Sequence, residues 1–190
     1  QRDFSEIHPK TMFDELGRLQ KARKTVSVIL HELKKVGVDP RATRLLDIGC
    51  STGILTRHYA EFFGKVVGID IDDGAVEWAR KNRSADNVSY RVGDSMEVPF
   101  LTGEFDLVTC THIYEHVPAA QRMLDEIFRV LKPGGVLGVV QLVVGIRDAH
   151  HHVAVFRIDF KITQPERYGL LRVLHATPRI ASAAQRKQVL

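Results

Sequence analysis

A short turn between two apolar segments carries the residues with the clearest chemical potential. The stretch Leu45–Gly53 begins as a buried-strand pattern containing Asp47 and ends in a small-residue turn bounded by Gly49 and Gly53. Glycine has no Cβ, and the first turn of a helix has unpaired N–H groups, so a ligand can approach this backbone closely. The next apolar segment ends in Asp70. A glycine turn followed by a carboxylate at the end of the next strand is how α/β folds hold a nucleoside.

Two later apolar segments also end in polar pairs. Gly93-Asp94 follows one of them, and Thr111-His112 follows the other. In a parallel sheet the carboxyl ends of neighbouring strands share one edge, and ligands bind there. We therefore expect four loops to meet at one edge and to form a single site.

The glycine turn matches three patterns to different degrees. A dinucleotide-binding turn reads G-x-G-x-x-G, but Ser51 occupies the place of the second glycine, and the lysine of a phosphate-binding loop is absent. Gly49-x-Ser51-x-Gly53 also matches the nucleophile elbow of hydrolases, which would make Ser51 a nucleophile. That alternative leaves Asp70 and Asp94 without a role, and the elbow normally follows several earlier strands. We therefore favour a ligand-binding turn.

Strands and helices alternate along the middle of the chain. Apolar runs typical of buried strands cover Thr43–Ile48, Lys65–Ile69, Val88–Val92, Phe105–Cys110 and Val136–Val144. Helical patterns cover Thr52–Phe63, Asp73–Arg83 and Ala119–Leu131, and an amphipathic helix, or two helices broken near Lys24, precedes them at Met12–Val36. This alternation predicts an α/β fold with a Rossmann-like, doubly wound and mostly parallel sheet covered by helices on both faces. Beyond these elements we expect a strand at Val153–Lys161 and helices at Glu166–Leu174 and Ala181–Leu190.

The composition is that of an ordinary globular domain. The 190 residues are 44% hydrophobic and 26% charged, which is enough for one domain with a substantial core. The apolar run Val136–Ile146 is too short to span a membrane, and no secretory signal is visible. Cys50 and Cys110 do not form a disulfide framework, which favours a cytoplasmic location. Basic residues beyond residue 160 are scattered among apolar ones, which favours a solvated helix face over a surface that binds nucleic acid.

Five segments together resemble a known family. They are LLDIGCSTG at 45–53, VVGIDID at 66–72, VGDSMEVPF at 92–100, FDLVTCTHIYEHVP at 105–118 and RVLKPGGVL at 129–137. In this order and spacing they are similar to class I S-adenosylmethionine-dependent methyltransferases, of the small-molecule group that includes ubiquinone-biosynthesis enzymes. The family more often has a glycine where this chain has Ser51. The resemblance implies one methyltransferase domain over 1–190, with an N-terminal helical lid at 1–40, a cofactor-binding core at 43–144 and an atypical C-terminal region at 145–190.

The resemblance also implies how S-adenosylmethionine would be held. Asp47 would accept from the cofactor's ammonium or hold the loop, and Thr111 would offer its carbonyl to the same ammonium. Gly49 and Gly53 would allow close approach of the methionine and the ribose. The remaining contacts would come from the two strand ends that follow. Asp70 would bind the ribose hydroxyls, Ile71 would cover the adenine, Asp94 would accept from the adenine amino group, and the backbone of Ser95 and Met96 would lie near the ring nitrogens.

The segment after the fourth strand is where an acceptor should enter. His112 is our first candidate for a catalytic base, because neutral imidazole has a suitable pKa, and His116 is the second. In the family, the Glu115-His116 pair often stabilises the loop instead. His112-x-x-Glu115-His116 also matches a zinc peptidase pattern, but that pattern needs a helix, and we expect no metal here.

These observations predict an enzyme that transfers a methyl group from S-adenosylmethionine to an oxygen atom of a small-molecule acceptor. A nucleic-acid or protein methyltransferase is an alternative favoured by the basic C-terminal residues. That alternative is weakened because Thr111–Tyr114 stands where an Asn/Asp-Pro-Pro-Tyr/Phe tetrad would position an amine. A non-catalytic nucleoside-binding module is the third alternative.

Overall fold

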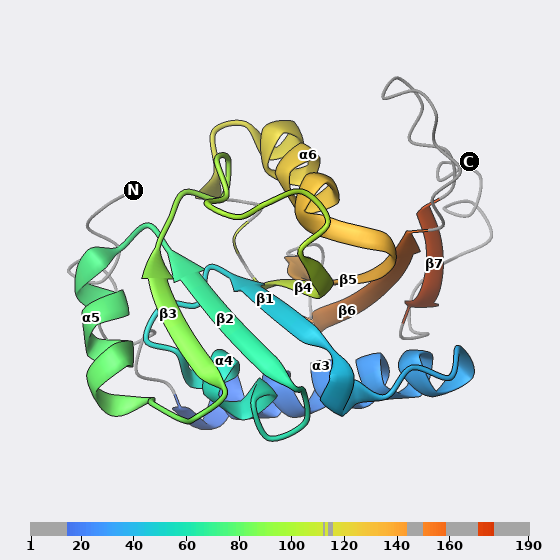
Figure 1. The fold of residues 1–190 in the computed structure, drawn as a ribbon, viewed down its shortest axis with the longest axis horizontal. Coiled ribbons are helices and arrows are strands. Elements are labelled where there is room, and N and C mark those ends of the chain that lie inside the picture. Colours follow the sequence, from blue (N-terminus) through green and yellow to red (C-terminus); the bar gives the residue numbers. More distant parts are fainter. Residues whose placement is uncertain (1–14, 112, 114–115, 144–149, 159–170, 177–190) are drawn as a thin grey trace.

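The chain forms one seven-stranded sheet with helices on both faces (Figure 1). The structure, a computed structural model, describes residues 15–111, 113, 116–143, 150–158 and 171–176. The strand order is β3-β2-β1-β4-β5-β6-β7. Strands β1 to β5 are parallel to their neighbours, whereas β6 and β7 pair antiparallel. The predicted Rossmann-like α/β class is confirmed.

The elements follow the order expected from the sequence over residues 15–143. The strands of the parallel part are β1 (Arg44–Ile48), β2 (Lys65–Asp70), β3 (Val88–Val92), β4 (Phe105–Thr111) and β5 (Leu131–Val143). The helices are α3 (Glu15–Lys35), α4 (Ile54–Tyr59), α5 (Asp73–Asn82) and α6 (Ala120–Val130), with a short 3-10 turn η1 at Pro40–Ala42. The antiparallel strands are β6 (His150–Ile158) and β7 (Leu171–Ala176). None of the described helices is long and apolar enough to cross a membrane.

Strand β1 lies at the centre because its side chains are apolar on both faces. Leu45 packs into the cluster beneath α3 and α4, while Leu46 and Ile48 pack into the cluster beneath α6. All three are fully buried. A strand buried on both faces is typical of a parallel sheet covered by helices, and Figure 1 shows α6 on one face with α3 and α4 on the other.

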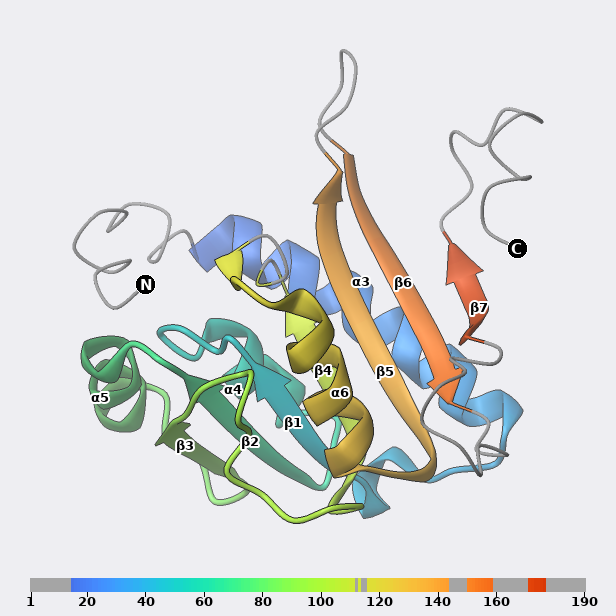
Figure 2. The same cartoon turned by 90° about the horizontal axis from the view of Figure 1, so that it is seen from above.

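Helix α3 is a single uninterrupted helix, without the break near Lys24 that the sequence left open. Its buried residues include Ala22, Val26, Ile29 and Leu33, which recur at the three-and-four spacing of one helix face. This face packs against α4 and continues beneath β5 and β6 (Figure 2). The amphipathic pattern therefore buries one face of α3 against α4 and the sheet.

The C-terminal prediction was partly wrong. Residues Leu171–Ala176 form β7 and pair with β6, whereas the sequence predicted a helix over Glu166–Leu174. Whether a run of six residues forms a helix or a strand depends on the segments that it packs against. Here the hairpin formed by β5 and β6 has an open edge with which these residues pair. The predicted strand at Val153–Lys161 overlaps β6, which begins earlier, at His150. The predicted helix at Ala181–Leu190 lies outside the described residues, and the division of the chain into lid, core and C-terminal region stays a prediction.

A close approach at Gly68 fixes the position of the glycine turn over β2. A Cβ on Gly68 would lie 2.8 Å from the Cys50 Cβ and 3.0 Å from both the Cys50 Sγ and the Thr56 Cγ2. Both neighbours are buried, so neither side chain has room to move away. The absence of a side chain at this position lets the turn and α4 pack directly on the sheet.

Gly68→Ala should therefore destabilise the fold by about 1–3 kcal/mol, the usual cost of overpacking a core. Gly74→Ala on α5 is the matched control, because its Cβ would meet only the Asp72 Oδ1, at 3.4 Å. That control should be neutral or stabilising by up to about 1 kcal/mol, since alanine favours helices. Urea denaturation of both variants measures the difference, and equal effects would contradict the packing argument.

Candidate functional site

The strand order brings the four predicted loops to one edge of the sheet. Strand β1 lies between β2 and β4, and β3 lies on the far side of β2. The pairs Ile48↔Ile69, Ile48↔Cys110 and Asp70↔Val92 align the carboxyl ends of the strands. The glycine turn, Asp70, Asp94 and Thr111 therefore follow neighbouring strand ends.

The glycine turn has an unusual run of left-handed backbone. Gly49, Ser51 and Gly53 have φ angles of +76°, +50° and +74°. Such angles are free for glycine but cost a residue with a Cβ roughly 1–2 kcal/mol, which explains why a glycine at position 51 would also suit this turn. The Gly49 and Cys50 N–H groups both donate to the Ile69 carbonyl at 2.9 Å, which fastens the turn to β2.

Both glycines of the turn lie against bulky side chains. A Cβ on Gly49 would lie 3.0 Å from the Ile113 Cδ1, and a Cβ on Gly53 would lie 2.7 Å from the Tyr90 Cε1. The turn therefore leaves no space for larger residues at these two positions. Its shape is set by the loop after β4 on one side and by β3 on the other.

Asp70 is anchored by the backbone on both sides of it. Its Oδ2 accepts from the Ser51 N–H at 2.8 Å, and its Oδ1 accepts from the Asp72 N–H at 3.0 Å. Burial raises the pKa of the Asp70 carboxyl, and the backbone donors of Asp72, Ser51 and Ile71 oppose that shift. A carboxylate can accept about four hydrogen bonds. Asp70 therefore keeps capacity for a further donor, such as a ligand hydroxyl.

Residues beside Asp70 and after β3 complete this side of the site. Ile71 is an apolar side chain that stays 37% exposed, at the rim next to Asp70. Asp94 closes a tight turn, because its Oδ1 accepts from the Met96 N–H at 2.7 Å. Ser95 is buried within this turn, and Met96 is half-buried. An exposed isoleucine near a carboxylate turn suits a flat, partly polar ring.

Asp47 is buried beneath the site and bridges two elements. Its Oδ2 accepts from the Thr56 hydroxyl of α4 at 2.6 Å, and its Oδ1 accepts from the Thr109 hydroxyl of β4 at 2.9 Å. Burial raises the pKa of Asp47 to about 6, although both threonines lower it. Of the two roles left open for Asp47, the geometry favours holding the loop.

The structure describes only part of the segment after β4, where we expect the acceptor to bind. Thr111 is half-buried at the end of β4, and its backbone lies at the same edge as the glycine turn. His116 is exposed, and its N–H donates to the Ile113 carbonyl at 2.8 Å. His112 lies outside the described residues, as does Glu115. Among the residues that are described, no three His, Cys, Asp or Glu side chains form a group that could hold a metal ion.

The structure argues against the nucleophile alternative for Ser51. The Ser51 hydroxyl is buried and has no hydrogen-bond partner among the described residues. A serine nucleophile needs a base within hydrogen-bond reach. Cys50 is also unsuited to nucleophilic chemistry, because burial raises the pKa of its thiol well above the ordinary value.

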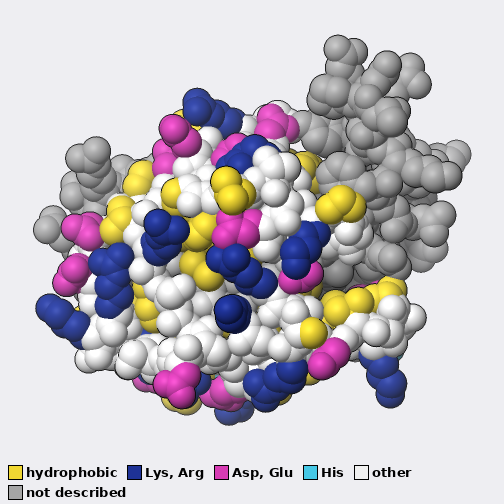
Figure 3. Space-filling view, viewed as in Figure 1, with side chains coloured by type: hydrophobic (Ala, Val, Ile, Leu, Met, Phe, Trp, Pro, Cys, Tyr) yellow, Lys and Arg dark blue, Asp and Glu magenta, His cyan; other side chains and the backbone are white. Residues whose placement is uncertain are grey.

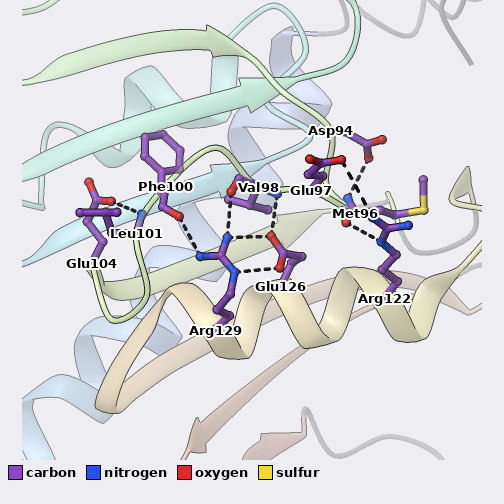
Figure 4. Close-up of polar contacts among 10 residues, drawn as sticks. All are labelled: Asp94, Met96, Glu97, Val98, Phe100, Leu101, Glu104, Arg122, Glu126 and Arg129. Atoms are coloured by element: carbon purple, nitrogen blue, oxygen red, sulfur yellow. Dashed lines mark hydrogen bonds and ion pairs between the residues drawn. The ribbon is translucent and has the colours of Figure 1, made fainter.

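Sequence reasoning missed a set of contacts that holds the loop after β3 (Figure 4). Arg129 of α6 donates to the Val98 and Phe100 carbonyls at 2.8 Å, and it pairs with Glu126 at 2.7 Å. Glu126 in turn accepts from the Val98 N–H at 2.8 Å. Arg122, one helical turn before Glu126, donates to the Met96 carbonyl at 3.0 Å. We call these three side chains the α6 clamp. In the sequence, the spacing of Glu126 and Arg129 predicts a pair on one helix face. That spacing does not show which loop the pair binds.

The geometry fits a nucleoside with an amino-acid tail. The glycine turn places its backbone beside Asp70, Asp70 keeps acceptor capacity for hydroxyls, and Ile71 offers an apolar rim. In a Rossmann-like sheet of this strand order, these features define the cofactor edge of a class I methyltransferase fold.

Comparison with known proteins agrees with this class. Residues 46–139 match the family described as "Methyltransferase domain". These residues are therefore a domain of the class I S-adenosylmethionine-dependent methyltransferase family.

Two curated relatives and one solved structure illustrate the similarity. A sterol 24-C-methyltransferase from Yarrowia lipolytica is 38% identical over 114 residues, covering 57% of this chain and 30% of the relative. A demethylmenaquinone methyltransferase from Lactococcus lactis is 33% identical over 136 residues, covering 68% of this chain and 51% of the relative. A Bacillus halodurans C-125 structure, of a protein proposed to be a methyltransferase, is 29% identical with a TM-score of 0.53, covering 63% of this chain and 53% of that chain. The chain thus spans from about a third to about half of the length of these curated relatives.

Asp47→Asn should change how stability depends on pH. The folded-state pKa of about 6 lies above the ordinary 3.8, so the folded protein holds more protons than the unfolded chain between these values. The contribution of Asp47 to the free energy of unfolding is therefore complete below pH 4 and is lost as pH rises through 6. At about 1.4 kcal/mol per pKa unit, wild type should lose roughly 2–3 kcal/mol relative to the variant over this window.

Urea denaturation of wild type and Asp47→Asn at several pH values between 4 and 7 measures this difference. The exposed Asp86 supplies a control, since Asp86→Asn should follow wild type across the whole range. Parallel curves for wild type and Asp47→Asn would contradict the burial argument.

Proposed function

We propose that this chain transfers a methyl group from S-adenosylmethionine to a small-molecule acceptor. The observation that carries the proposal is the Asp70 carboxylate. It is fixed by the Ser51 and Asp72 N–H groups beside a left-handed glycine turn, and it retains acceptor capacity. That arrangement suits a ribose, and the family match of residues 46–139 supports the cofactor.

The contacts that we propose for the cofactor are those expected from the sequence. In this proposal Asp70 accepts from the two ribose hydroxyls and Ile71 covers the adenine. Asp94 accepts from the adenine amino group, while the backbone of Ser95 and Met96 faces the ring. Gly49 and Gly53 admit the ribose and the methionine, and the Thr111 carbonyl accepts from the ammonium.

Bound S-adenosylmethionine supplies an already activated methyl group, so the protein's part is to place the acceptor in line with the sulfonium. A hydroxyl acceptor also needs a base, whereas a neutral amine already carries the lone pair that attacks the methyl group. His112 and His116 stay our candidates for this base. His116 lies after β4 on the side where the acceptor would enter.

We propose the chemical class of the acceptor from the names of the relatives. The two curated relatives are named for a sterol and for demethylmenaquinone, which are small apolar molecules. Transfer to oxygen is our sequence-based prediction, and carbon is the alternative that the name of the sterol relative favours. A panel of phenols, quinones and sterols, with the product's new bond assigned by mass spectrometry and NMR, separates the two.

The surface agrees with a small-molecule acceptor better than with a nucleic acid. On the face shown in Figure 3, basic and acidic side chains of the described residues are interspersed. A protein that binds a phosphate backbone usually gathers its basic side chains in a patch or stripe. We therefore rank the nucleic-acid methyltransferase second.

Asp70→Asn should weaken binding of S-adenosylmethionine and S-adenosylhomocysteine by about tenfold or more, because two charge-assisted hydrogen bonds would lose their charge. Ligand at about a hundred times its dissociation constant should stabilise wild type by about 2.7 kcal/mol. Thermal unfolding with and without each ligand measures both effects.

Asp86→Asn is the matched control, since Asp86 is an exposed aspartate. It should keep the full stabilisation by ligand. A folded wild-type protein that neither ligand stabilises would overturn the proposed function. Stabilisation without methyl transfer to any acceptor of the panel would favour the nucleoside-binding module.

A further inference from the structure

The turn after β3 presents an acceptor and a donor next to each other at the cofactor edge. The Asp94 Oδ1 accepts from the Met96 N–H at 2.7 Å, whereas the Asp94 Oδ2 makes no hydrogen bond within the described part of the chain. The N–H of Ser95, which lies between them in the sequence, also has no hydrogen-bond partner among the residues that the structure describes. The turn therefore keeps one acceptor and one donor for a ligand.

This pair is complementary to adenine but not to the deaminated base. Adenine offers an amino donor next to a ring-nitrogen acceptor, so the Asp94 carboxylate and the Ser95 N–H can bind both groups. Hypoxanthine has a carbonyl oxygen and a ring N–H at the same two positions, so its acceptor and donor are exchanged. A site built for one pattern rejects the other, because its own polar groups are then left unpaired.

The backbone of Met96 is held from two sides. Its N–H donates to Asp94, and its carbonyl accepts from the Arg122 Nε at 3.0 Å. Figure 4 shows Arg122 reaching from α6 to this part of the loop. The next residue, Glu97, donates its N–H to the Asp94 carbonyl at 3.1 Å and completes the turn. The hydrogen bond from Arg122 therefore fixes the peptide group that closes the turn.

The other two residues of the α6 clamp act further along the loop. Arg129 donates to the Val98 and Phe100 carbonyls, and Glu126 accepts from the Val98 N–H. These contacts attach the far end of the loop to α6. Arg122 is the member of the clamp that lies next to the turn with the unpaired donor and acceptor.

The Arg122 side chain contributes little to the packing of the fold. It is 65% exposed, and its ion pair with Glu97, which is 85% exposed, has a distance of 4.0 Å. Exposed ion pairs of this kind stabilise a fold only slightly. The contact with the Met96 carbonyl is therefore the one through which Arg122 can affect the site.

We infer that Arg122 positions the turn formed by Asp94, Ser95 and Met96 for recognition of the cofactor's adenine. Arg122 acts through the Met96 carbonyl and does not touch the base, so it is a positioning residue. The inference rests on the proposed function and adds a residue of α6 that controls the choice of base. The competing explanation is that Arg122 stabilises only the surface of α6.

Two ligands that differ only in the base separate these explanations. S-inosylhomocysteine has the carbonyl of hypoxanthine where S-adenosylhomocysteine has the amino group of adenine. Calorimetric titration of both ligands into wild type, Arg122→Met and Arg122→Lys gives the ratio of their dissociation constants. Arg122→Met keeps an apolar side chain and removes the donors. Gln121→Ala is the matched control, because Gln121 lies on the same turn of α6 and donates to Asp125 instead of the loop.

Wild type should bind S-adenosylhomocysteine at least about tenfold more tightly than S-inosylhomocysteine, because the second ligand exchanges donor and acceptor. Arg122→Met should lower this ratio to about threefold or less, mainly by weakening the adenine ligand, since a loosely held turn loses geometric selectivity. Arg122→Lys should recover part of the ratio, because an ammonium can also donate to a carbonyl. Gln121→Ala should keep the wild-type ratio.

An unchanged ratio in Arg122→Met would overturn the inference, whatever the two affinities are, and would assign Arg122 to the surface of α6. Partial unfolding weakens both ligands by the same factor, so it cannot change the ratio by itself. Equal binding of the two ligands by wild type would also overturn the inference. A folded wild type that binds neither ligand would overturn the proposed function and this inference with it.

Discussion

The buried Asp47 carboxylate is the contact on which the rest of the site depends. It lies on β1 and accepts hydrogen bonds from Thr56 of α4 and Thr109 of β4. A buried carboxylate without partners would be strongly unfavourable, so both threonines have to stay in place. This requirement fixes α4, and therefore the glycine turn before it, relative to two central strands. The turn in turn presents the Ser51 N–H that orients Asp70.

Much of the core could be predicted because several sequence signals agreed there. The apolar runs of β1 and β2 end in turn residues, and the helix after β2 begins at Asp73, after an Asp72 that accepts from the Ala75 N–H as an N-cap. Such local signals do not depend on distant residues. The start of β5 was misplaced, since α6 ends at Val130 and the strand begins at Leu131 without a loop.

Contacts between distant segments could not be predicted in the same way. Residues Leu171–Ala176 are a strand because β6 offers an edge, and no property of those six residues alone requires it. Asp106, near the start of β4, illustrates the same point. Its carboxylate accepts from the Arg44 N–H and from Lys132, and neither contact can be seen in the residues next to it in the sequence.

The α6 clamp has a consequence for how the two halves of the site respond to ligands. Arg122, Glu126 and Arg129 tie α6 to the loop that follows β3, while the start of α6 continues directly from the segment after β4. A shift of α6 therefore displaces the loop after β3 as well, unless these hydrogen bonds break. Thermodynamic linkage makes any such coupling reciprocal: if a molecule bound on the β4 side changes the affinity for one on the β3 side by some factor, the second changes the affinity for the first by the same factor.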